Sequence, residues 1–159
     1  MGARAEQLAS QFEAKAREAE GVFDRLTDTD WKKVTTAEKW PVGVVAHHVA
    51  TAHEGLGNLV KALGAGQTKG DVSMDMVHAM NAKHAQEHAG CAKAETIALH
   101  RKNAAAAAAI VRGLSDAELD RSGPVLQGMP DMTAAQLAGS LLVGHPDEHL
   151  ASIRATVGA

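Results

Sequence analysis

The sequence has few of the residues that build disulfide-stabilised, β-rich or membrane-spanning proteins. A single cysteine, Cys91, excludes a disulfide within the 159 residues. Aromatic residues make up only 3% and tyrosine is absent, so the core has to be built from Ala, Leu, Val, Met and Ile. Such a composition favours packed helices over a sheet. No apolar run reaches the ~20 residues of a transmembrane helix, so we expect no membrane span.

The charges of the chain are nearly balanced. The formal net charge is −3, from 16 basic and 19 acidic residues. This balance gives no electrostatic reason to expect a nucleic acid or an anionic membrane as partner. The N-terminal residues MGARAEQLAS have the pattern of an amphipathic helix and not of a secretion signal, so we expect a cytoplasmic protein.

Hydrophobic periodicity predicts an all-α protein with a single domain over residues 1–159. Four long helices are expected over residues 3–27, 41–63, 92–113 and 133–157, and a shorter one over residues 72–89. The segment TDTDWKK, at 27–33, has the capping and turn residues of a break between helices. A long connection follows residue 113, with one turn of helix expected at 116–119. The alanine run 104–109 favours helix and lets a neighbouring backbone approach closely.

A four-helix bundle is the simplest architecture that buries four amphipathic faces in one core. If the short helix at 72–89 belongs to a crossover between the second and third bundle helices, those two run parallel and the topology is up-down-down-up. A five-helix bundle with a continuous antiparallel path is the alternative.

Histidine is the residue in excess, with nine copies. His145 and His149 are four residues apart in LLVGHPDEHLASIR, which places both rings on one helix face. Such a pair either holds a metal ion or simply shares a surface. A third ligand comes from WPVGVVAHHVATAHEGL, where His48 follows the apolar spacing that faces the core and His47 is displaced by about 100°. His48, His145 and His149 are therefore the predicted metal ligands.

Three imidazoles around a divalent ion leave one coordination position open, which is typical of reactive sites and not of closed structural ones. Zinc is the first choice of metal, with nickel or iron as alternatives. Each ligand should donate its second ring N–H to an acceptor, for which Glu54, Asp147 and Glu148 are the nearby acidic candidates. Pro146 follows the first ligand of the pair and lacks a backbone N–H, so we expect a kink that either widens the site or dismantles it.

The short helix at 72–89 carries a second pair of the same spacing, His84 and His88. Together with Asn81 they could form a roof over the metal, where Asn81 would hydrogen-bond a substrate. A solvated polar face is the alternative. The remaining histidines are interpreted as surface or satisfied polar residues: His47, His53, His78 and His100.

Three further residues have two interpretations each. Cys91 precedes a helix N-terminus, which can lower a thiol pKa, although a small buried or capping residue is the commoner role. Trp40 closes the bundle end or shapes a pocket beside the site. Arg154 lies one turn beyond His149, where it meets an anionic substrate or serves as a helix-end charge.

Several of these stretches resemble the DinB/YfiT-like superfamily. WPVGVVAHHVATAHEGL is similar to the superfamily's second helix, in which a double histidine follows a tryptophan, and GHPDEHLASIR is similar to its last-helix His-x-x-x-His. MNAKHA and ALHRKNAAAAAAIVRGLSDAELDR resemble the middle of actinobacterial members, including the mycothiol-dependent maleylpyruvate isomerase type. The resemblance covers about residues 5–157. It implies a four-helix bundle that binds one divalent metal, carried over onto His48, His145 and His149.

The resemblance implies a function more loosely than a fold. It points first to a metal-dependent S-transferase or isomerase that uses mycothiol or a similar small bacterial thiol as co-substrate. A metal-dependent hydrolase is the second hypothesis, because the same open position could activate water. A non-catalytic metal-binding or interaction bundle is the third, and a fourth ligand from His84 or His88 would favour it. The expected partner is a small-molecule substrate, with a homodimer as a further option.

Overall fold

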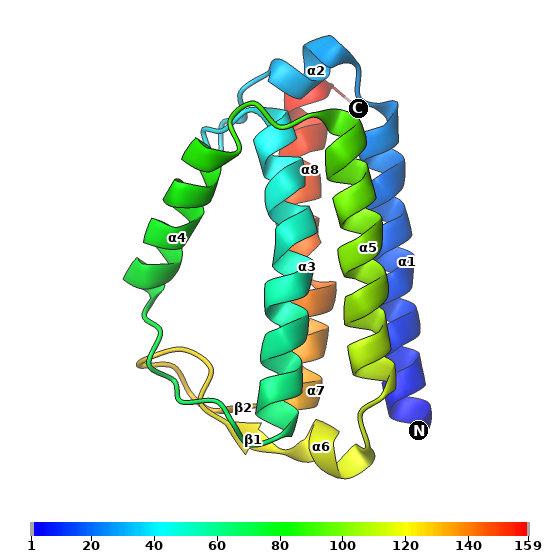
Figure 1. Cartoon of the computed structure of the whole chain (residues 1–159), viewed down its shortest axis with the longest axis vertical. Coiled ribbons are helices and arrows are strands. Elements are labelled where there is room, and N and C mark those ends of the chain that lie inside the picture. The colour runs from blue at the N-terminus through cyan, green and yellow to red at the C-terminus, as the bar shows by residue number, and fades with distance from the viewer. Residues whose placement is uncertain (1, 159) are drawn as a thin grey trace.

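The computed structural model describes residues 2–158 as helices with one short two-stranded ribbon (Figure 1). In chain order the elements are α1 (Ala3–Arg25), α2 (Asp28–Lys32), α3 (Val42–Gly64), α4 (Met74–Glu87), α5 (Lys93–Arg112), α6 (Asp116–Asp120), β1 (Ser122–Gly123), β2 (Met132–Thr133), α7 (Ala134–Leu137), η1 (Ala138–Val143) and α8 (His145–Val157). The ribbon pairs β1 with β2 in antiparallel register. The all-α prediction is confirmed.

The bundle consists of α1, α3, α5 and the composite helix α7–η1–α8. Figure 1 shows α1 rising, α3 and α5 descending, and the last helix rising again. Ion pairs between Lys15 and Asp147, at 2.5 Å, and between Glu18 and Arg154, at 3.1 Å, fix α1 and α8 as parallel. The crossover between α3 and α5 contains α4, so the up-down-down-up topology is confirmed and the five-helix alternative is wrong.

The segment at residues 27–33 does more than break the first helix. Thr27 accepts from the backbone N–H of Asp30, and the Asp30 carboxylate accepts from that of Thr27, which makes a capping box. This box starts the five-residue helix α2, which the sequence analysis interpreted as a turn. The same device starts α6 at Ser115 and α7 at Thr133, while the β1–β2 ribbon was not predicted.

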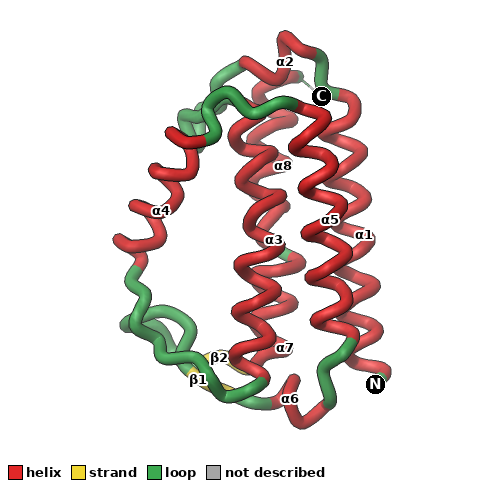
Figure 2. The backbone as a smooth tube through the Cα atoms, viewed as in Figure 1, coloured by secondary structure: helices red, strands yellow, loops and turns green. Residues whose placement is uncertain are grey.

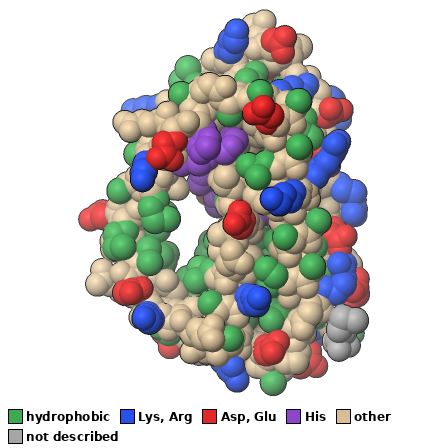
Figure 3. All heavy atoms as spheres, viewed as in Figure 1, with side chains coloured by type: hydrophobic (Ala, Val, Ile, Leu, Met, Phe, Trp, Pro, Cys, Tyr) green, Lys and Arg blue, Asp and Glu red, His purple; other side chains and the backbone are tan. Residues whose placement is uncertain are grey.

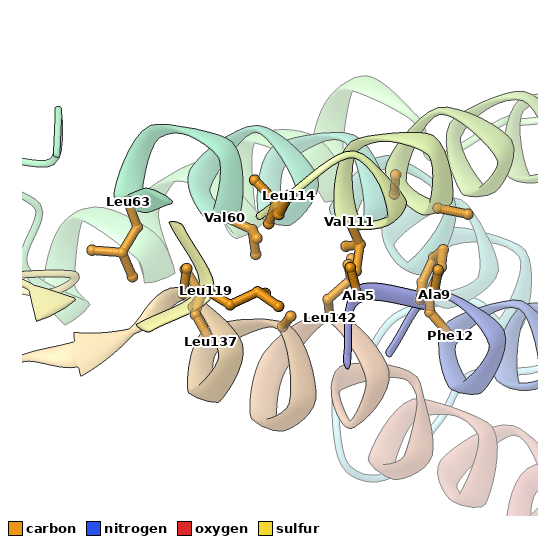
Figure 4. Close-up of a cluster of buried hydrophobic side chains, with 14 of the residues drawn as sticks. Ala5, Ala9, Phe12, Val60, Leu63, Val111, Leu114, Leu119, Leu137 and Leu142 are labelled. Carbon is orange, nitrogen blue, oxygen red and sulfur yellow. The ribbon is translucent and has the colours of Figure 1, made fainter. Parts of the chain in front are cut away.

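Two apolar clusters fill the bundle. Figure 4 shows the one toward the α6 end, built from α1, α3, α5, α6 and the last helix; it includes Ala5, Ala9, Phe12, Val60, Leu63, Val111, Leu114, Leu119, Leu137 and Leu142. A Cβ placed on Gly57 of α3 would lie 3.2 Å from the Cβ of Ala107. This close approach confirms the role expected for the alanine run in α5. The other cluster lies toward α2 and includes Phe23, Val45, Val49, Leu150 and Ile153.

The last bundle helix changes its winding immediately before the predicted ligands. Residues Ala138–Val143 form π-helical turns, and α8 then begins at His145 with Pro146 in its first turn, where no N–H is required. A Cβ on Gly144 would lie only 2.5 Å from the carbonyl oxygen of Ser140, so this junction needs glycine. The irregularity expected from Pro146 is therefore a π-helical segment that ends beside His145.

Helix α4 stands apart from the bundle on the α3 side, as the tube in Figure 2 shows. None of its residues is buried, whereas the bundle helices α1, α3 and α5 each bury seven or more. Among residues 2–158, no helix combines the length and the hydrophobicity needed to cross a bilayer.

Candidate metal centre

The structure brings together the three histidines proposed as metal ligands. His48 of α3 meets His145 and His149 of α8, and one nitrogen from each ring lies within 4.8 Å of the other two. The Nε2 atoms of His48 and His145 are 3.2 Å apart. The ring centroids are separated by 4.7 to 5.1 Å. A group of three imidazole nitrogens at these distances could hold one metal ion, and we refer to it as the bundle triad.

Local sequence explains why these rings converge. His48 lies between Val45 and Val49 on the core-facing stripe of α3 and is only 8% exposed. His145 and His149 occupy successive turns of α8, so both rings project from the same side of that helix. The π-helical turns end before the first of them, and therefore the i, i+4 relation survives.

A carboxylate that the sequence analysis did not name positions one ligand. Nδ1 of His149 lies 2.8 Å from a carboxylate oxygen of Glu38, and the hydroxyl of Ser152 donates to the other oxygen at 2.6 Å. With its Nδ1 proton donated to Glu38, His149 presents Nε2 as the free ligand atom. Glu38 is in the loop before α3, next to Lys39, whose φ is +61°.

The three acidic residues suggested for that role lie elsewhere. Asp147 pairs with Lys15 of α1, and Glu54 and Glu148 are exposed. These candidates were chosen by helical spacing, which cannot predict the position of a loop residue such as Glu38. The only sequence signal for Glu38 is its place two residues before Trp40, whose indole packs edge-on against the His48 ring at 5.5 Å.

The environment of the bundle triad keeps two of its rings, those of His48 and His145, neutral. Burial, together with the neighbouring imidazoles, lowers the pKa of His48 to about 3 and that of His145 to about 4. Burial would raise the pKa of Glu38, but hydrogen bonds from Ser152, His149 and Thr35 outweigh it and the pKa is lowered. Neutral imidazoles at His48 and His145, beside an ionised carboxylate, suit the binding of a divalent metal.

Two ring nitrogens are buried without a hydrogen-bond partner. Among the described residues, the buried side-chain polar atoms in this condition are Nδ1 of His145 and Nδ1 of His84. Orphaned buried polar atoms are rare in proteins, and a missing ion or water is one common reason for them. One of the two belongs to the bundle triad, whose set of three converging imidazoles fits a metal ion.

The second orphaned nitrogen belongs to a separate histidine group. His84 and His88 of α4 meet His47 of α3, again with one nitrogen of each within 4.8 Å of the others. Of the two roles expected for His47, surface or satisfied polar residue, the structure shows the second, because the ring is 8% exposed and its Nδ1 lies 2.8 Å from Nε2 of His84. The sequence analysis did not place it in a histidine group. The doublet His47–His48 carried the signal, since adjacent helix residues point in directions about 100° apart.

The other residues singled out from the sequence have simpler environments. Arg154 pairs with Glu18 of α1, in accord with a helix-end charge. The thiol of Cys91 donates to the carbonyl of Gly43 at 3.3 Å, and burial raises its pKa, which disfavours a reactive thiolate. Asn81 is half-buried on α4, one turn before His84.

His53 and His100 form a buried, satisfied pair, as expected. Nε2 of His100 donates to the carbonyl of Ala16 at 2.9 Å, which leaves Nδ1 of His100 to accept from Nε2 of His53 at 3.1 Å. Both rings also meet a phenylalanine edge-on, Phe12 for His53 and Phe23 for His100. His78 is exposed on α4.

Comparisons with known proteins agree with this geometry at the level of the family. Neither the curated proteins nor the solved structures gave a match. A family model, described as the DinB superfamily, matches residues 11–153, a span that contains all three members of the bundle triad. With the match extending over most of its length, the chain belongs to the DinB superfamily.

Proposed function

We propose that the protein is a metal-dependent enzyme that acts on a small molecule at the bundle triad, with thiol S-transfer or isomerisation as its reaction. The observation that carries the proposal is a set of three converging imidazoles, and not four, with a carboxylate positioned behind one of them. Three protein ligands are typical of catalytic metal sites, where the remaining position receives water or substrate.

The arrangement of α4 supports the catalytic reading over a closed binding site. A non-catalytic bundle would be favoured if His84 or His88 completed the coordination of the triad. Instead both turn to His47, with Nε2 of His84 2.8 Å from Nδ1 of His47. Figure 3 shows histidine side chains at the surface above an opening between α4 and the bundle.

The roles of the chain's own residues follow from their contacts. His48, His145 and His149 would bind the ion through ring nitrogens, and Glu38 fixes the tautomer and orientation of His149. Trp40 provides an apolar wall beside His48. When bound, a divalent ion supplies a Lewis acid that lowers the pKa of a thiol or a water at its open position. The choice of thiol over water rests on the resemblance to thiol-dependent members.

Metal analysis followed by a thiol-dependence assay tests the proposal. Zinc-loaded protein is mixed with a small thiol and an electrophile such as a maleyl compound, and product is measured with and without the thiol. The proposal expects turnover that needs both metal and thiol and is lost in His145→Asn/His149→Asn. Metal-dependent turnover of ester or amide substrates without thiol would establish the hydrolase instead. Full metal loading with neither activity would favour the third hypothesis, a non-catalytic metal-binding bundle.

A further inference from the structure

A second group of three histidines lies beside the bundle triad and is not needed to explain it. Its members are His47 of α3 and His84 and His88 of α4. Nδ1 of His47 lies 2.8 Å from Nε2 of His84, and the His47 ring stacks on that of His88 with centroids 4.1 Å apart. The rings of His84 and His88 are 4.7 Å apart. Three imidazoles thus meet at one place, with distances similar to those of the bundle triad.

The sequence supplies this second group by the same two devices as the first. His84 and His88 share one face of α4 through i, i+4 spacing, as His145 and His149 do on α8. The doublet on α3 sends its two rings to different sides, so that His48 faces α8 while His47 faces α4. One pair of adjacent residues therefore serves two separate groups.

Hydrophobic burial does not account for the position of α4. None of its residues is buried, and three methionines on it are between 43% and 60% exposed, namely Met74, Met76 and Met80. The hydrogen bond between His47 and His84 and the stacking of His47 on His88 join this helix to α3. Contacts between imidazole rings alone hold a helix only weakly, so a bound group that links the rings would explain the position of α4.

The chemistry of the group fits a cation. Nδ1 of His84 is buried without a partner. Since one nitrogen of each ring lies within 4.8 Å of the other two, a single ion could bind all three imidazoles.

We propose that His47, His84 and His88 form a second binding site for an imidazole-preferring divalent ion, such as zinc or nickel, and that the ion ties α4 to α3. Two ligands come from α4 and one from α3, so occupancy crosslinks the two helices. The His84 ring also lies 5.8 Å from that of His48. Binding at the second site would therefore fix α4, the helix whose His84 ring lies beside the bundle triad.

Zinc stoichiometry, measured by equilibrium dialysis and elemental analysis, tests the proposal with paired variants. The wild type should bind two ions per chain, and His84→Asn/His88→Asn should bind one. The fold of that variant is expected to survive, because α4 contributes nothing to either apolar cluster. His78→Asn is the matched control, an exposed histidine of the same helix that should leave both ions in place.

The triad variant His145→Asn/His149→Asn separates this proposal from the proposed function. One ion in that variant, lost on adding the α4 substitutions, confirms the second site, whatever happens at the triad. Equal numbers of ions in the wild type and in His84→Asn/His88→Asn overturn it. If the triad variant binds none, the second site is refuted while the proposed function stands. Circular dichroism verifies that each variant is helical.

Hydrogen exchange tests the link to α4. Zinc should slow exchange of the α4 amides by at least tenfold in the wild type and in the triad variant, because opening the helix must then break a coordinated crosslink. No such protection is expected in His84→Asn/His88→Asn. Zinc binding that leaves α4 exchange unchanged in the wild type would refute the crosslink.

Discussion

Replacing Glu38 by glutamine isolates the effect of one negative charge on the bundle triad. Nδ1 of His149 and the hydroxyl oxygen of Ser152 lie 2.8 and 2.6 Å from the two carboxylate oxygens of Glu38. Glutamine keeps the size of the side chain, can still accept a hydrogen bond from His149 and can still contact Ser152. The charge is lost while the hydrogen-bonded framework remains. Because metal binding places positive charge on the imidazole, the carboxylate should strengthen the coordinated state more than the free one.

The magnitude follows from the burial of this pair. The side chains of His149 and Glu38 are 17% and 10% exposed, so solvent screens their contact only weakly. A hydrogen bond to a charged group contributes about 1.5 to 3 kcal/mol, against about 1 for a neutral one. The difference, about 1 to 2 kcal/mol, corresponds to a zinc affinity roughly 10-fold lower, at the lower end of the 10- to 100-fold range for such outer partners.

Competition with a chromogenic zinc chelator measures this change. The parent should carry His88→Asn, so that only the bundle triad is titrated. Asp147→Asn is the matched control, because Asp147 lies on the same helix but pairs with Lys15, and its affinity should equal that of the parent. Equal affinities for Glu38→Gln and its parent, or an equal loss in the Asp147 control, would refute the role assigned to Glu38.

Three further predictions concern other parts of the molecule. His149→Ala should lose the triad ion while circular dichroism shows the same helix content; two ions per chain in that variant would contradict it. Gly144→Ala should lower the free energy of unfolding by about 2 kcal/mol in urea titrations, since its Cβ would lie 2.5 Å from the Ser140 carbonyl oxygen; unchanged stability would show that the junction is not tight. The metal-free protein should lose stability as pH falls below about 6.5, because the folded state holds the pKa of His53 at about 3 and the unfolded chain then binds more protons. His53→Gln, which keeps the donor to His100, should reduce the loss between pH 7 and 5 by about 2 kcal/mol; an unaltered pH dependence would refute the neutral pair.

The helices of the bundle were predictable because each has a local signal. Apolar spacing defines α1, α3, α5 and the last helix to within about two residues, and Pro41 and Thr133 mark the starts of two of them. The short helix α2 was missed because its capping box uses the same Thr and Asp residues that make turns. The π-helical turns before His145 have no periodic signature that distinguishes them from α-helix.

The candidate site divides in the same way. The bundle triad was named from i, i+4 spacing and from the apolar stripe of α3, and its three rings do converge. Glu38 could not be predicted in this way, because a loop residue has no periodic spacing from which its position in the fold can be inferred. His47 was expected to be a surface or satisfied polar residue, and it is a satisfied one. Only the course of the crossover, which places α4 over His47, decided that its neighbours are histidines.

The sequence by itself determined which residues are helical, which face of each helix is apolar, and which histidines share a turn. These are properties of neighbours three and four residues apart, and short-range geometry decides them. The tertiary structure alone decided what meets those faces: Glu38 behind His149, and α4 beside His47. The members of these two pairs are separated in the sequence by 111 and 37 positions, respectively. Such contacts depend on the path that the long connections take, and no local sequence pattern encodes that path.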